Sequence, residues 1–238
     1  MLKQFSSYLK SSVLLDNKIV VILVLLISIT TYAQETVRIM TYNLCEYPNT
    51  EQYGDASFRN PYFRTIINDV NPDILCVEEM HGETYANNFL ANVLNYSETS
   101  YAMADFVLNV ADNDDNNVLY YKTSKFSLIP GSYIIDDIGH VTVKFKLYNI
   151  NTRDTLTIYS IHLASGEENG ERYTQAVKIR ESSDSLSSSE YFIGVGDFNM
   201  YGGTEITEPA YYIFDTNTGG YFIDPQGLDD LDNWSDNS

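Results

Sequence analysis

Apolar runs that each end in polar residues dominate the hydrophobic pattern of this chain. Residues 36–44 alternate between two faces, which is the period of a strand. Ile74–Val77 and Tyr191–Val195 are short uninterrupted runs of apolar residues, typical of strands buried on both faces. Thr155–Ile161 is a further strand-like run. The polar residues at or just beyond these four ends are Asn43, Glu79, His162, and the pair Asp197 and Asn199.

Helical periodicity separates the first two of these strands. Phe63, Ile66, Ile67 and Val70 recur at the spacing of one helix face, and the helix should end at Asn71-Pro72-Asp73, because the residue before a proline is driven out of the α region. A strand, a helix and a second strand predict parallel pairing through a right-handed crossover.

The rest of the chain mixes short strands with further helices. The predicted helices are 84–94, 170–183 and a short one near 209–214. The predicted strands are 105–110, 118–121, 141–147 and 221–223, with a hairpin turn at 149–154 before the run that ends in His162. We expect Lys144 and Lys146 on the exposed face of their strand.

The N-terminus has the pattern of a secretory signal peptide. An apolar run, Ile19–Ile29, follows three lysines and precedes small residues up to Ala33, and the run is too short to span a bilayer. We therefore expect a signal peptide over residues 1–33 and a secreted, periplasmic or cell-surface protein with no stable membrane insertion after cleavage. An uncleaved membrane-anchored N-terminus is the alternative.

The expected mature protein is strongly acidic. The chain has 14 Lys and Arg against 33 Asp and Glu, and removal of residues 1–33 takes away three lysines and one aspartate, which leaves a net charge of −21. Such a charge argues against a broad basic surface for nucleic acid. A nucleic-acid substrate stays open, because bound divalent cations reverse the local sign at a site. The two cysteines, Cys45 and Cys76, can pair or stay free, and we favour free thiols.

The polar strand ends suggest a metal-dependent site. Strand ends gathered at one edge of a sheet form ligand sites, and carboxylate with amide oxygens suits Mg²⁺ or Mn²⁺ better than zinc. Only one of three histidines lies at a strand end, which argues against a histidine-rich zinc site. Residues 112–116, Asp-Asn-Asp-Asp-Asn, are similar to the start of a calcium loop and keep Ca²⁺ as an alternative ion. They lack its glycine and distal glutamate, so a solvated acidic loop is the favoured interpretation.

Four motifs in order resemble a known family. They are Met40-Thr41-Tyr42-Asn43-Leu44, then Pro72-Asp73-Ile74-Leu75-Cys76-Val77-Glu78-Glu79, then Ile161-His162-Leu163, then Gly196-Asp197-Phe198-Asn199. Together they resemble the endonuclease/exonuclease/phosphatase superfamily of metal-dependent phosphoesterases. The resemblance implies an α/β four-layer sandwich, with two packed mixed β-sheets flanked by helices, over residues 34–238, with the last strands missing.

The resemblance also implies roles for matching residues. Asn43 and Glu79 would hold Mg²⁺ or Mn²⁺, with Glu79 as the principal ligand, whereas the neighbouring Glu78 would face the interior. His162 would contact the scissile phosphate, and Asp197 and Asn199 would orient the nucleophilic water, with Asn199 also contacting the phosphate. The implied substrate is a phosphate ester in a nucleic acid, a lipid head group or a small molecule.

Two departures from the family pattern limit these expectations. No histidine follows His162, so the Asp-His pair that ends the family's final strand is absent, and we expect this chain by itself to hydrolyse phosphodiesters poorly. No phosphate-binding arginine precedes the His162 strand, where residues 136–140 read Asp-Asp-Ile-Gly-His, and His140 has no surrounding motif. The alternative function is a catalytically inactive secreted binding protein that keeps the fold.

Overall fold

The computed structural model describes residues 35–49, 51–98, 100–135, 140–200, 208–215 and 219–223. The compact unit to which the fold belongs begins at Val37. Among the described residues, no helix is both long and apolar enough to cross a bilayer. The signal peptide expected over residues 1–33 lies outside the described residues.

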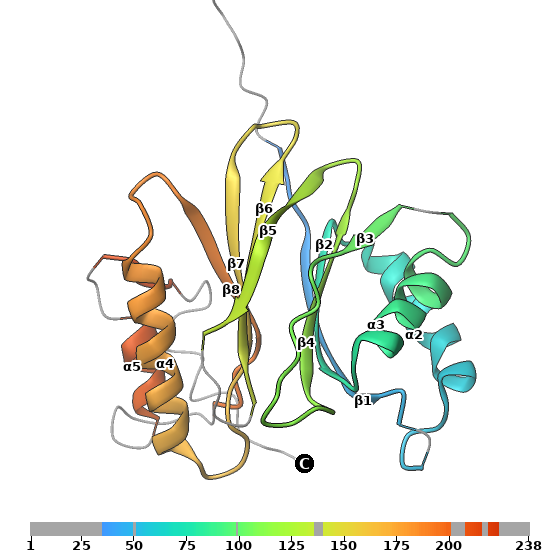
Figure 1. The fold of residues 1–238 in the computed structure, drawn as a ribbon, viewed down its shortest axis with the longest axis horizontal. Coiled ribbons are helices and arrows are strands. Elements are labelled where there is room, and N and C mark those ends of the chain that lie inside the picture. The colour runs from blue at the N-terminus through green and yellow to red at the C-terminus, as the bar shows by residue number, and fades with distance from the viewer. Residues whose placement is uncertain are drawn as a thin grey trace, which may run out of the picture. The chain divides into compact units, whose positions relative to one another are not determined.

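Two four-stranded sheets form the centre of this unit (Figure 1). The first sheet has the order β1-β2-β4-β3, with β1 and β2 parallel and the other pairs antiparallel. The second has the order β5-β6-β7-β8, with β7 and β8 parallel and the other pairs antiparallel. The strands are β1 Ile39–Tyr47, β2 Ile74–Met80, β3 Tyr101–Met103, β4 Asn116–Lys122, β5 Phe126–Ile134, β6 Thr142–Asn149, β7 Thr155–His162 and β8 Tyr191–Asp197.

Helices cover the outer face of each sheet, which makes four layers (Figure 1). The first sheet is covered by α2, α3 and the π-helical turn η1, and the second by α4 and α5. Their bounds are α2 Ala56–Val70, α3 Glu83–Phe89, η1 Leu90–Leu94, α4 Asn169–Asp184 and α5 Pro209–Asp215. The predicted α/β sandwich of two mixed sheets with flanking helices is confirmed.

Alternating side chains of β2 build two of the three apolar layers. Leu75 and Val77 pack toward α2 and α3, whereas Ile74 and Cys76 pack between the two sheets against Val143 and other residues of β6 and β7. Both faces of β2 are therefore buried, which explains its continuous apolar sequence. A third apolar layer joins β7 to α4 and α5.

Local signals set both ends of α2, and its C-terminal end lies where the sequence predicts it. Asp55 caps its N-terminus by accepting a hydrogen bond from the Phe58 backbone amide at 2.9 Å. Asn71 ends it in the left-handed conformation, with φ 49°. The predicted helices at 170–183 and 209–214 are also found, and the helix at 84–94 is α3 followed by η1.

Three expectations about the strands are wrong. Residues 105–110 and 221–223 form no strand, because neither segment pairs with a neighbouring strand; the Phe222 backbone amide donates instead to the Phe214 carbonyl at 2.9 Å. The hairpin strand β5 was not expected. Lys144 is buried rather than exposed, because its ammonium group packs over the rings of Tyr133 and Tyr159 and donates to Ser182 Oγ at 3.2 Å.

Candidate active site at the joined edges of two sheets

Backbone irregularities aim the side chains at the ends of β1 and β2. The register between the two strands shifts after Asn43, and Cys45 and Glu46 have positive φ. The pairing of β2 with β4 shifts between Val77 and Met80, and Glu79 itself has φ 58°. Such bulges redirect side chains and are frequent beside active sites. Glu78 therefore stays in the interior while Glu79 turns toward the edge.

The side chain of Asn43 joins two carboxylates that come from different sheets. Its Nδ2 donates to Glu79 Oε1 at 2.7 Å and to Asp197 Oδ2 at 3.2 Å. The other oxygen of Glu79 accepts from the Glu46 backbone amide at 3.0 Å. All three predicted side chains are partly exposed. The structure thus brings Asn43, Glu79 and Asp197 together.

The two carboxylates fit a divalent cation, whereas Asn43 faces them with its Nδ2, and its Oδ1 accepts from the Cys45 backbone amide at 2.8 Å. Glu79 and Asp197 each have a carboxylate oxygen within hydrogen-bond distance of one nitrogen, so two negative charges face the same small volume. Carboxylate and amide oxygens are the ligands of Mg²⁺ and Mn²⁺.

The end of β8 depends on a close approach to β7. Asp197 lies beside His162 in the parallel pairing of the two strands. Gly196, with φ 146°, precedes it, and a β-carbon at that position would lie 1.8 Å from the backbone oxygen of Ile161. Only glycine fits there. Asn199 has φ 48°, and its backbone amide donates to Asp197 Oδ1 at 3.0 Å, while its Nδ2 donates to the Leu163 carbonyl at 2.9 Å.

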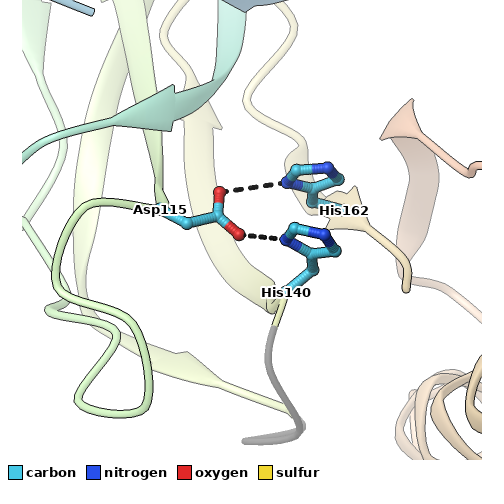
Figure 2. Close-up of side chains that lie close together, drawn as sticks. All are labelled: Asp115, His140 and His162. Atoms are coloured by element: carbon cyan, nitrogen blue, oxygen red, sulfur yellow. Dashed lines mark hydrogen bonds and ion pairs between the residues drawn. The ribbon is translucent and has the colours of Figure 1, made fainter. Parts of the chain in front are cut away.

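A carboxylate shared by two histidines lies at the same edge (Figure 2). His162 Nδ1 contacts Asp115 Oδ1 at 3.1 Å, and His140 Nδ1 contacts Asp115 Oδ2. Because an ionised carboxylate can only accept, each Nδ1 is the donor. The two imidazole rings stack, with centroids 4.0 Å apart and planes 20° apart. The site therefore contains an aspartate–histidine pair, although no histidine follows His162 in the sequence.

The shared carboxylate sets the charge of this cluster. Burial alone would raise the pKa of Asp115, but the hydrogen bonds from His140 and His162 outweigh it and hold that pKa well below its usual range. The hydrogen bond to Asp115 raises the pKa of His140 above its ordinary 6.5, against burial, which lowers it. The cluster is an anionic carboxylate flanked by an imidazole that favours its protonated form.

The shape of this cluster favours hydrogen bonding over direct metal binding. Asp115, His140 and His162 offer ligand atoms that lie within 4.8 Å of one another, so their residue types suit a transition metal. An imidazole binds a metal through a lone pair in its ring plane. Two nearly parallel rings stacked at 4.0 Å cannot both direct such lone pairs at one ion.

Sequence reasoning missed Asp115 and His140 because both precede antiparallel strands. β4 runs antiparallel to β2, with Asn116 paired to Met80, and so begins where β2 ends. β6 runs antiparallel to β7, with Thr142 paired to Ile161, and so begins where β7 ends. The expectation of a solvated acidic loop at 112–116 is wrong for Asp115 and Asn116, which are buried, and holds for the exposed residues 112–114. The sequence signal that could have identified them is a polar residue shortly before a buried strand, as Asp115 is before β4 and His140 before β6.

Comparisons with known proteins support the fold. The model of the Endonuclease/Exonuclease/phosphatase family matches residues 40–222. Among solved structures, an endonuclease/exonuclease/phosphatase from Bacteroides vulgatus matches with TM-score 0.60 and 19% identity, covering 77% of this chain and 72% of that one. The human Nocturnin catalytic domain with bound sulfate anion matches with TM-score 0.59 and 20% identity, over 76% and 70%.

The chain is also similar to the structure of a phosphatase, and it spans only part of the longer structures that it matches. The Bacteroides thetaiotaomicron mannosyl-6-phosphatase matches with TM-score 0.59 and 16% identity, covering 76% of this chain and 70% of that one. Other structures of this fold are matched over as little as 56% of their length. Among curated proteins, none matches this chain in sequence.

Proposed function

Because this chain belongs to the Endonuclease/Exonuclease/phosphatase family, we propose that it is a secreted divalent-metal-dependent phosphoesterase. The observation that carries the proposal is the convergence of Glu79 and Asp197 on the Asn43 amide, beside His162. Metal-assisted attack of water on a phosphate ester needs this combination of hard oxygen ligands and a polar group near the phosphate.

Each residue has a defined task in the proposed reaction. Asn43 and Glu79 would hold Mg²⁺ or Mn²⁺, which supplies positive charge to a phosphoryl oxygen when bound. Asp115 keeps the Nδ1 proton of His162 in place, so the Nε2 atom of His162 is the one directed away from the carboxylate (Figure 2). That nitrogen would contact the phosphate or its leaving oxygen. Asp197 would orient the attacking water, with Asn199 beside it.

The substrate is a phosphate monoester or diester. The structural neighbour from Bacteroides thetaiotaomicron is a mannosyl-6-phosphatase, which makes sugar phosphates suitable first substrates. A chain with net charge −19 gives no long-range attraction to a polyanion, so a small phosphate ester is a better first choice than nucleic acid.

Metal binding and turnover test the proposal. Isothermal titration with Mn²⁺ is compared for the wild type, Glu79→Gln and Glu181→Gln, an exposed residue in the last part of α4. We expect Glu79→Gln to weaken Mn²⁺ binding by at least tenfold, because it removes a charged ligand, and Glu181→Gln to bind as the wild type does. Equal Mn²⁺ affinity in Glu79→Gln would contradict the assigned metal site.

Hydrolysis of p-nitrophenyl phosphate and bis(p-nitrophenyl) phosphate then separates enzyme from binding protein. We expect weak turnover that requires Mg²⁺ or Mn²⁺ and is lost in Glu79→Gln. Tight Mn²⁺ binding with no turnover of either ester would support the inactive binding protein. Secretion is tested separately, by sequencing the N-terminus of the exported protein, which we expect to begin just after Ala33.

A further inference from the structure

Asp115 binds a second imidazole, that of His140, which it does not need in order to orient His162. Asp115 needs only one imidazole partner to hold the proton of His162, yet its second oxygen accepts from His140. His162 is almost fully buried, with a 2% exposed side chain, whereas the side chain of His140 is 28% exposed. The second imidazole is thus the more accessible member of the pair.

Contacts from three directions hold His140 in place. Its Nδ1 donates to Asp115, and its Nε2 lies 3.3 Å from Ser165 Oγ. Its backbone carbonyl accepts from Gln175 Nε2 at 2.8 Å, and the side-chain oxygen of that fully buried glutamine accepts from the Ala164 amide at 2.9 Å. A surface histidine with no task does not need a buried glutamine to anchor its backbone.

Electrostatics give His140 a task at a phosphate site. An ionised Asp115 behind the ring of His162 presents a negative charge to an incoming anion. A protonated His140 cancels that charge, and it stacks on the ring of His162, where a cation and an aromatic face attract each other. The charged or titratable groups that act on His140 are Asp115, Glu79 and Asp112, which all favour its protonated form, and His162, which stacks on it.

We propose that His140 is a positioning residue that supplies positive charge beside His162, so that the stacked pair binds a tetrahedral oxyanion of the phosphate or sulfate type without help from a metal. The inference rests on the proposed phosphoesterase function and adds an anion-binding group to it. In each ring the second nitrogen, Nε2, lies on the side away from Asp115 (Figure 2). Sulfate is the suitable probe, because its charge does not change between pH 5.5 and 8.5.

The direct test measures sulfate affinity of the full chain in excess EDTA by isothermal titration. His140→Asn keeps an N–H donor for Asp115 but carries no charge, whereas His140→Ala removes both. Arg153→Gln is the control for loss of one positive charge, since Arg153 lies in the turn before β7, at the opposite end of that strand from His162. Circular dichroism establishes that each variant is folded.

We expect His140→Asn to bind sulfate about tenfold to a hundredfold more weakly at pH 6, because the contact between sulfate and the positively charged His140 ring is lost. Wild-type affinity should fall as the pH rises above 6.5 through the raised pKa of His140, and this pH dependence should be lost in His140→Asn. Arg153→Gln should stay within about twofold of the wild type. Wild-type affinity and pH profile in His140→Asn would overturn the proposal.

A second measurement separates charge from mere structural support. The chain has three histidines, so their ring proton resonances can be assigned with single variants. Asp115→Asn should lower the pKa of His140 and weaken sulfate binding in parallel, and an unchanged His140 titration would contradict the role of Asp115. Sulfate binding needs no turnover, so this inference can hold even if the chain does not hydrolyse esters. If the wild type hydrolyses esters and His140→Asn leaves both sulfate affinity and hydrolysis unchanged, this inference is rejected while the proposed phosphoesterase function stands.

Discussion

Glu78 and Glu79 are adjacent, yet the structure gives them opposite environments. Glu78 is fully buried and accepts from Thr41 Oγ1 at 2.9 Å, and its second oxygen has no hydrogen-bond partner. Burial raises the pKa of Glu78 to about 8; the hydrogen bond from Thr41 opposes this, and the charge of Asp197 adds to it. Glu78 is therefore protonated at neutral pH in the folded protein, beside a neighbour suited to bind metal.

The raised pKa of Glu78 makes stability depend on pH. Below about pH 4.5 the carboxyl is protonated in both states, and above about pH 8 it is ionised in both. Between these values only the folded protein keeps the proton, so the free energy of unfolding falls as the pH rises. We expect Glu78→Gln to remove this loss, which corresponds to about 1.4 kcal/mol for each unit of pKa shift.

Urea unfolding of the metal-free protein in EDTA at pH 5, 7 and 8.5 checks this prediction. The gain of Glu78→Gln over the wild type should be smallest at pH 5 and largest at pH 8.5. Because other groups titrate equally in both proteins, the difference between them isolates Glu78. A gain that is constant over the three pH values would show that Glu78 does not change its protonation on unfolding.

At the scale of single elements, β8 shows why a glycine precedes the predicted site aspartate. The backbone of Gly196 approaches Ile161 so closely that an added β-carbon would collide with its carbonyl group. Gly196→Ala should force β8 away from β7 and move Asp197 from its place beside His162. We expect a loss of at least about 2 kcal/mol in the free energy of unfolding.

The matched control for this substitution is Gly170→Ala in α4. A β-carbon at Gly170 meets nothing within 4 Å, so alanine should leave stability unchanged or raise it by about 0.4–1 kcal/mol. Chemical denaturation and Mn²⁺ titration of both variants provide the comparison. Equal stability of the two alanine variants would contradict the close approach of β8 to β7.

The sequence predicted those elements whose own residues carry the full hydrophobic pattern or end signals of a strand or helix. Strands buried on both faces, such as β2, and the capped helix α2 are examples. It failed for β5, whose sequence is interrupted by Pro130 and Gly131 and acquires strand structure by pairing with β6. It also failed for Asp115 and His140, because their place in the site depends on which strands run antiparallel.

At the scale of the whole unit, the candidate site exists only because two sheets pack face to face. Asn43 and Glu79 come from the first sheet, and His162 and Asp197 come from the second. Hydrogen bonds across the interface include those of Asn43 with Asp197 and of Asp115 with His162. Asn117 Nδ2 also donates to the carbonyl groups of Val141 and Ser160, at 2.9 and 2.8 Å. The spacing of the sheets therefore controls the geometry of the site.

Substitutions of two buried phenylalanines can distinguish the effect of sheet spacing on the site from the effect of lower overall stability. Phe145 lies in the apolar layer between the sheets, whereas Phe89 lies between the first sheet and its helices, and both are almost completely buried. Replacing either with leucine should lower the free energy of unfolding by about 1–2 kcal/mol. Only Phe145→Leu alters the contact between the sheets, so it alone should weaken Mn²⁺ and sulfate binding, measured well below the unfolding transition. Equal loss of binding in Phe89→Leu would mean that the site responds to global stability and not to the packing of one sheet on the other.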